Sequence, residues 1–120
     1  MNRRVFTWAL VCGALLAPSA FAHAMLERAE PAVGAHVRQA PRALNLQFSD
    51  MLDVWSCSLR LSDAAGRNVD LGPLSLGDDG MTLMAPIRSP LTAGAYTVHW
   101  RATSLDTHVT SGDFSFSVRR

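Results

Sequence analysis

The chain has 120 residues, of which 48% are hydrophobic and 18% charged, with eleven Lys and Arg against ten Asp and Glu. This near balance of charges excludes the strongly basic surface that favours nucleic acid or an anionic membrane. The length suits one small domain and leaves no room for a second.

The first predicted element is an export signal over residues 1–22. A pair of arginines precedes an apolar run from Val5 to Leu16, which is too short to span a bilayer, and the small-x-small site Ala20-Phe21-Ala22 follows. We expect cleavage after residue 22, a periplasmic domain over 23–120 and no membrane insertion after cleavage. The paired arginines also match the start of a twin-arginine signal, so Sec and twin-arginine export both stay open.

Alternating apolar and polar residues predict a series of half-buried strands in the rest of the chain. The expected strands, separated by turns rich in Gly, Pro and Asp, cover residues 24–29, 44–48, 55–62, 69–71, 81–85, 96–103 and 112–118. About seven short strands without helical periodicity predict an all-β fold, a β-sandwich. The segment from Leu91 to Tyr96 matches the tyrosine corner of immunoglobulin-like sandwiches.

The alternation also predicts which side chains form the core. Trp55, Cys57 and Leu61 fall on one face of their strand, and Trp100 falls on the inner face of the clearest strand. Cys57 is the only cysteine left after cleavage, so no internal disulfide can form, and we expect a buried, unreactive thiol.

His23 becomes the first residue of the mature protein if cleavage occurs as predicted. Its free α-amine and its imidazole then offer two nitrogens to one metal ion. The loop Ser104-Leu105-Asp106-Thr107-His108 supplies further donors, because a strand continued past residue 104 would drive the Asp106 carboxylate into the core at high cost. Two residues apart in extended chain, Asp106 and His108 start about 6.5 to 7 Å apart on one side.

Together, His23, Asp106 and His108 give an amine nitrogen, two imidazole nitrogens and a carboxylate oxygen. This nitrogen-rich set favours Cu(II), which also heads the divalent affinity order. On spacing alone, however, a solvated polar turn explains Asp106 and His108 as well as a metal site does.

Sequence motifs along the mature chain resemble the CopC family of periplasmic copper-binding, copper-resistance proteins. The matching stretches are His23-Ala24-x-Leu26, Pro31-Ala32-x-Gly34-Ala35, Leu46-x-Phe48-Ser49, Gly94-x-Tyr96-x-Val98-x-Trp100-Arg101, Ser104-x-Asp106-x-His108 and Gly112-x-Phe114-x-Phe116-x-Val118. The resemblance implies an immunoglobulin-like or cupredoxin-like Greek-key β-sandwich. It also implies one Cu(II) ion per chain, held by His23, Asp106 and His108, and a CopD-type inner-membrane copper protein as partner.

Two departures from the family pattern concern the site. Thr107 stands where the family usually has glycine, and a left-handed backbone there would strain a β-branched residue, so we expect a slightly reshaped loop. The chain also lacks the methionine-rich loop that holds Cu(I) in some members, which predicts a Cu(II)-only protein. Its scattered methionines are expected to be packing or rim residues: Met25, Met51, Met81 and Met84. Asp50 corresponds to an acidic residue near copper in some members and is either an outer-sphere group or an ordinary loop aspartate.

Three functions compete for this site. The leading one is a non-enzymatic copper carrier for copper homeostasis and resistance, in which His36 and His99 are solvated surface residues. An oxidative enzyme is the second, because an N-terminal histidine with another histidine also resembles the copper site of lytic polysaccharide monooxygenases. A metal-free interaction module is the third.

Overall fold

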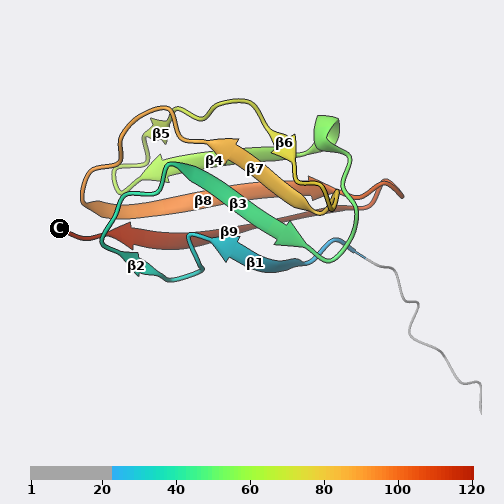
Figure 1. Ribbon diagram of the computed structural model, residues 1–120, viewed down its shortest axis with the longest axis horizontal. Helices are drawn as coiled ribbons and strands as arrows, with labels where there is room; N and C mark the ends of the chain where they lie inside the picture. The colour runs from blue at the N-terminus through green and yellow to red at the C-terminus, as the bar shows by residue number, and fades with distance from the viewer. Residues whose placement is uncertain (1–22) are drawn as a thin grey trace, which may run out of the picture.

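The computed structural model describes residues 23–120, so the predicted signal peptide lies outside the described residues. The strands are β1 Leu26–Glu30, β2 His36–Val37, β3 Ala43–Phe48, β4 Ser58–Asp63, β5 Asn68–Val69, β6 Ser75–Leu76, β7 Thr82–Pro86, β8 Gly94–Thr103 and β9 Val109–Val118, with one 3-10 turn, η1, over Val54–Ser56. They form a four-stranded sheet in the order β1-β3-β7-β6 and a five-stranded sheet in the order β2-β9-β8-β4-β5 (Figure 1). The all-β sandwich expected from the sequence is confirmed.

All seven strands that the alternation predicts are present. The two that it misses, β2 and β6, have two residues each, which is too short for a periodic signal. β9 begins at Val109, three residues before the expected start at Gly112. Within residues 23–120, no helix is long and apolar enough to cross a membrane.

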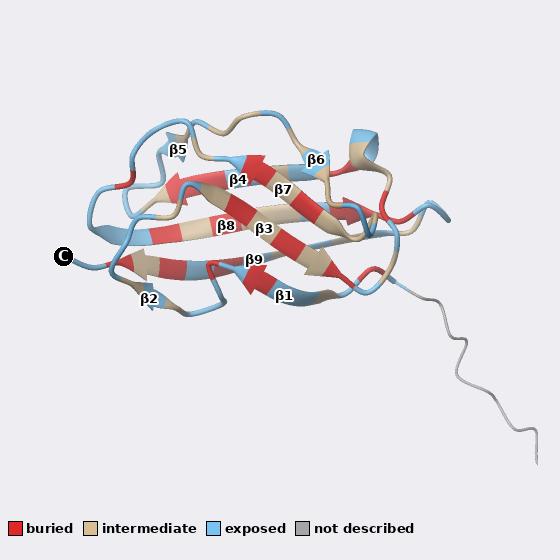
Figure 2. Ribbon diagram, in the orientation of Figure 1, coloured by how far each residue is buried: buried red, intermediate tan, exposed pale blue. Residues whose placement is uncertain are grey.

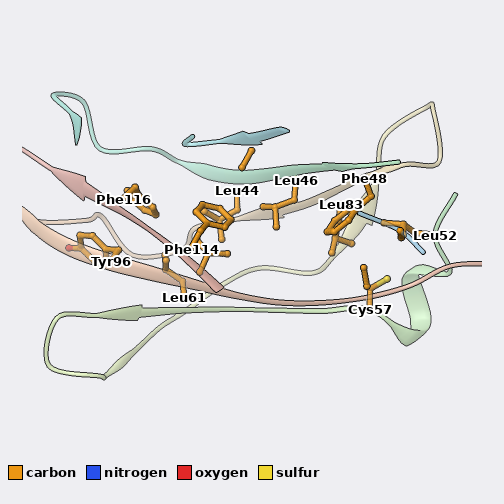
Figure 3. Close-up of a cluster of buried hydrophobic side chains, with 14 of the residues drawn as sticks. Leu44, Leu46, Phe48, Leu52, Cys57, Leu61, Leu83, Tyr96, Phe114 and Phe116 are labelled. Atoms are coloured by element: carbon orange, nitrogen blue, oxygen red, sulfur yellow. The ribbon is translucent and has the colours of Figure 1, made fainter. Parts of the chain in front are cut away.

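The core lies between the sheets and follows the period-two pattern of the strands. In β3, the side chains of Leu44, Leu46 and Phe48 are fully buried, and the residues between them are half-buried (Figure 2). β7 supplies Leu83 opposite Leu46, while Phe114 and Phe116 of β9 reach in from the other sheet (Figure 3). Burial of such side chains contributes about 1.5–3 kcal/mol each, which allows the domain to fold without a disulfide.

The hairpin of β8 and β9 is the longest paired unit, with an unbroken antiparallel register from Gly94 opposite Val118 to Thr103 opposite Val109. The Tyr96 hydroxyl at its start donates a 2.7 Å hydrogen bond to the Thr92 carbonyl, which confirms the predicted tyrosine corner. The hairpin therefore runs as a rigid pair to its far end, where the loop 104–108 connects its strands.

Trp55 is not a core residue, contrary to the sequence prediction: its side chain is 94% exposed. Asp53 causes the difference by capping η1, because its carboxylate accepts the Trp55 N–H at 3.2 Å and the Ser56 hydroxyl at 3.1 Å. The 3-10 turn breaks the alternation before β4 begins at Ser58 and turns the indole outward.

Cys57 confirms the prediction of a buried thiol, at 9% exposure. Its sulfur lies 3.2 Å from the Asp53 carbonyl and accepts the Thr103 N–H at 3.4 Å. Burial is the main cause that raises the pKa of the Cys57 thiol, so the reactive thiolate is disfavoured.

Candidate metal centre

The loop between β8 and β9 holds two of the three candidate ligands. β8 ends at Thr103, and the loop closes through hydrogen bonds from the Ser104 N–H to the His108 carbonyl, 3.0 Å, and from the Thr107 N–H to the Ser104 carbonyl, 2.9 Å. Asp106 is exposed and His108 half-buried, so both lie at the rim of the sandwich and outside its core, as predicted.

The N-terminal segment is fixed beside this loop by two hydroxyl groups. Ser49 Oγ accepts the Met25 N–H at 2.8 Å and donates to the His23 carbonyl at 3.2 Å. From the other sheet, Thr110 Oγ1 donates to the Ala24 carbonyl at 2.7 Å. These bonds hold the backbone around His23 against both sheets.

His23 and His108 are thereby brought together although they lie far apart in the sequence. Their ring centroids are 5.2 Å apart with an interplanar angle of 78°. Asp106 also lies next to His108, with its Oδ2 3.1 Å from His108 Nδ1. Each candidate ligand therefore has another as a direct neighbour.

The side chains alone do not form a finished site: within residues 23–120, no three His, Cys, Asp or Glu groups are arranged so that they could hold a metal ion as they stand. One of the four expected donors is also absent from any uncleaved chain, because its His23 nitrogen is an amide bonded to Ala22. Cleavage would convert this amide into an amine with an unperturbed pKa of about 7.7–8.0.

The electrostatics of the loop favour an ionised carboxylate. The Ser104 hydroxyl, which donates to Asp106 Oδ1, is the main cause that holds the pKa of Asp106 down at about 2, and the neighbouring His108 ring adds to the effect. Asp106 is therefore an anionic oxygen donor throughout the neutral range.

Thr107 adopts the left-handed backbone that its position between Asp106 and His108 demands, with φ 74°. At this position the loop has a conformation that glycine adopts freely, and the β-branched residue carries the strain.

The other candidate residues are arranged less directly. Asp50 Oδ1 accepts the Met51 N–H at 2.8 Å, and the Met51 carbonyl accepts the Leu105 N–H at 3.1 Å, so this segment lies against the ligand loop. Of the four methionines expected to be packing or rim residues, Met81 and Met84 are half-buried, while Met25 and Met51 are exposed at 62% and 50%.

Neither remaining histidine belongs to the site. His36 is exposed in β2, with Nδ1 2.5 Å from Ser117 Oγ. His99 is only partly solvated: its Nε2 lies 3.0 Å from Ser62 Oγ and its Nδ1 2.7 Å from Asp113 Oδ1 on the outer face of the five-stranded sheet. These hydrogen bonds connect β4, β8 and β9 through Ser62, His99 and Asp113. The Ser62 hydroxyl is buried, since the residue is only 5% exposed.

Sequence reasoning missed two residues that position the site, Ser49 and Thr110. Ser49 ends the Leu46-x-Phe48-Ser49 motif, which contributes to the resemblance to the CopC family but does not itself indicate what the serine does. Thr110 has no sequence signal, because only the pairing of distant segments brings its hydroxyl to Ala24.

Comparison with known proteins places this arrangement in a family. The CopC domain matches residues 26–119. The copper resistance protein C of Pseudomonas syringae pv. tomato is 34% identical over 125 residues, covering 99% of this chain and 98% of that protein. The protein YobA of Escherichia coli K12 is 32% identical over 115 residues, covering 95% and 93%.

A solved structure agrees with these sequence matches. The crystal structure of PcoC, a methionine-rich copper resistance protein from Escherichia coli, superposes with a TM-score of 0.74 and 32% identity, covering 82% of this chain and 100% of that chain. With a domain match over nearly the whole described chain and full-length relatives above 30% identity, the protein belongs to the CopC family.

Proposed function

We propose that the mature protein begins at His23 and binds one Cu(II) ion through the α-amine and imidazole of His23, the carboxylate of Asp106 and the imidazole of His108. The observation that carries this proposal is the meeting of His23 and His108, at 5.2 Å between ring centroids, beside an ionised Asp106. The hydrogen bonds from Ser49 and Thr110 support it, since they fix the chain end next to the loop.

The donor chemistry favours Cu(II) over other common metals. Three nitrogens and one anionic oxygen suit a tetragonal Cu(II) ion, whereas Mg(II) and Ca(II) prefer oxygen ligands. We propose that the protein does not bind Cu(I) specifically. Cu(I) prefers soft thioether ligands, and Met81 and Met84 lie in or beside β7 and are half-buried.

The proposed role is that of a periplasmic copper carrier, exported by cleavage of residues 1–22, which sequesters Cu(II) for copper resistance. The names of two relatives, copper resistance protein C and PcoC, support the association with copper resistance. A CopD-type inner-membrane copper protein is the proposed recipient. The protein is proposed to act without catalysis, because Asp106 would fill the coordination position that oxygen chemistry needs open.

The exposure of Trp55 bears on the oxidative alternative, since such enzymes use aromatic residues to hold a polysaccharide. One indole is a small part of the broad surface that this chemistry requires, so the carrier stays the preferred function. Peroxide consumption that requires both copper and a polysaccharide, and that is lost in His108→Ala, would favour the enzyme.

The decisive experiment compares protein that begins at His23 with the same protein carrying one extra alanine before it. Cu(II) affinity is measured by competition with a chelator, and the ligand set by electron paramagnetic resonance. We expect the extension to weaken binding at least tenfold and to change the nitrogen-rich tetragonal signal, because it turns the His23 α-nitrogen from an amine into an amide, which binds Cu(II) only after losing a much less acidic proton. Equal affinities and spectra would remove the amine from the site.

A pH titration of the same protein gives a second readout. The His23 amine must lose its proton to bind, so copper affinity should fall as the pH drops from 8 to 5. An affinity that stays flat over this range would contradict the proposed ligands.

A further inference from the structure

The largest exposed apolar side chains gather at the end of the sandwich that carries the candidate ligands. Of the six that are exposed among residues 23–120, five belong to this end: Met25 at 62%, Met51 at 50%, Trp55 at 94%, Leu105 at 61% and Val109 at 46%. We call these five residues the site face. Exposed apolar residues are ordinary singly, but a group around a binding site marks an interaction surface.

Backbone hydrogen bonds join the segments of the site face to one another. The Ser49 N–H donates to the Met25 carbonyl at 2.9 Å, and the Leu105 N–H donates to the Met51 carbonyl at 3.1 Å. η1, which carries Trp55, is tied to the same end by the bond from the Asp53 N–H to the Thr103 carbonyl. These segments lie together at the end opposite the C-terminus (Figure 1).

The loops at the two ends of the molecule differ in charge. The segments 49–56, 77–81 and 103–109 contain no arginine and five acidic residues: Asp50, Asp53, Asp78, Asp79 and Asp106. The loop 77–81 belongs to this end because the Leu52 N–H bonds to the Gly80 carbonyl at 2.9 Å. Six arginines lie in the turns and termini of the opposite end: Arg38, Arg42, Arg67, Arg88, Arg119 and Arg120.

We propose that the site face is a docking surface for a copper-accepting protein whose own surface has apolar residues surrounded by arginine or lysine. This inference rests on the proposed function and adds the kind of partner. The complementary charge argues for a basic partner, since five carboxylates without a cation in these segments repel an acidic one.

The composition of the site face matches the anatomy of transient interfaces. Trp and Met are enriched in the buried centres of interfaces, and charged groups form their rims. The Trp55 side chain is 94% exposed, so its indole is available as an anchor. Docking here would bring an acceptor's ligands next to His23 and His108, where copper can pass between proteins without release into water.

The test uses two acceptor peptides that share a Gly-Gly-His copper-binding head and differ in the tail, Leu-Leu-Arg-Arg or Leu-Leu-Glu-Glu. Docking is measured first without copper, by nuclear magnetic resonance of isotope-labelled protein that begins at His23. We expect the basic peptide to shift the Trp55 indole signal and the Leu105 amide while leaving the Trp100 indole in place, and the acidic peptide to bind at least tenfold more weakly at low salt.

Matched variants separate the surface from total charge. Asp53→Asn/Asp78→Asn/Asp79→Asn should weaken binding of the basic peptide about tenfold, whereas Glu30→Gln/Asp63→Asn/Asp70→Asn changes the net charge equally and should leave it within about twofold. Trp55→Ser should also weaken binding while the other amide signals of the fold stay unchanged. In the copper-loaded protein, transfer to the basic peptide should be faster by a similar factor.

Three results would overturn the proposal. They are equal binding of the two peptides, signal shifts confined to the arginine-rich end, and Trp55 signals that change with protein concentration, which would make a second copy of the chain the occupant. Docking is measured without copper. A protein that failed to bind copper would therefore contradict the proposed function, while the peptide-binding measurement would still test the docking surface.

Discussion

Ser49 shows at the scale of one residue how the site depends on groups that never touch the metal. Its hydroxyl bridges the Met25 N–H and the His23 carbonyl, so it fixes the direction in which the mature chain would begin. A ligand held in place by such a partner loses affinity when the partner is removed, typically by 10–100-fold.

Ser49→Ala should therefore lower Cu(II) affinity about tenfold while the fold and its unfolding midpoint change little. The measurement is chelator competition on protein that begins at His23. Ser111→Ala is the matched control, since it removes an exposed hydroxyl from β9. Unchanged affinity in Ser49→Ala would mean that the chain end is positioned without the bridge.

Thr107 is the second residue whose conformation allows a direct test. Its φ of 74° places a β-branched side chain in a backbone region that L-residues avoid, at a cost of about 1–2 kcal/mol. Glycine removes this cost but loses about 0.5–1 kcal/mol in backbone entropy.

Thr107→Gly should stabilise the protein by up to about 1 kcal/mol, measured as a higher urea midpoint with an unchanged slope. Thr97→Gly, within regular strand β8, should have the opposite sign. If Thr107→Gly were less stable than the parent protein, the strain at this position would be smaller than the entropic cost of glycine, contrary to this prediction.

At the scale of the element, β9 shows where sequence periodicity succeeds and where it stops. Alternation placed Phe114, Phe116 and Val118 inward correctly, because a strand buried on one face has little freedom of register. It failed at Trp55, because the Asp53 cap places this residue in a 3-10 turn before the strand, while Cys57 and Leu61 keep the predicted buried phase. The ligand loop was predictable for the related reason that Asp106 could not enter the core.

The start of β9 was placed too late because Gly112 suggested a turn. In the structure Gly112 lies within β9, opposite Trp100, and its lack of a side chain makes room for the indole: a Cβ there would lie 2.7 Å from Trp100 Cζ2. The indole in turn packs edge-on against Phe48, with centroids 5.2 Å apart. Glycine at this position therefore reflects close packing, which no turn rule could reveal.

Gly112→Ala should destabilise the domain by about 1–3 kcal/mol, because the half-buried Trp100 ring must shift where it packs against Phe48. Trp55→Ala should change the free energy of unfolding by less than about 0.5 kcal/mol, since its side chain packs against little. Chemical denaturation of the two variants measures both effects. A larger loss of unfolding free energy in Trp55→Ala than in Gly112→Ala would contradict the description of Trp55 as exposed and Trp100 as packed.

At the scale of the whole molecule, the candidate ligands join the segment before the first strand to the loop before the last strand. His23 precedes β1 of the four-stranded sheet, and His108 precedes β9 of the five-stranded sheet. Unfolding separates these segments, so the unfolded chain retains only the local His23 and Asp106-x-His108 fragments. A ligand that binds the folded state alone stabilises it by an amount that grows with its concentration.

Copper should therefore raise the unfolding temperature of the whole domain. At a free Cu(II) concentration a hundredfold above Kd, linkage adds about 2.7 kcal/mol, and each kcal/mol shifts Tm by about 4–8 °C in a domain of this size. A rise of about 10 °C or more is expected for protein that begins at His23, measured by calorimetry with and without a chelator.

The alanine-extended protein and His108→Ala should show a much smaller rise at the same copper concentration, because each lacks one donor of the proposed site. If all three proteins gained equally, copper would be acting at another site, and the joining of the two chain segments would have no part in holding it.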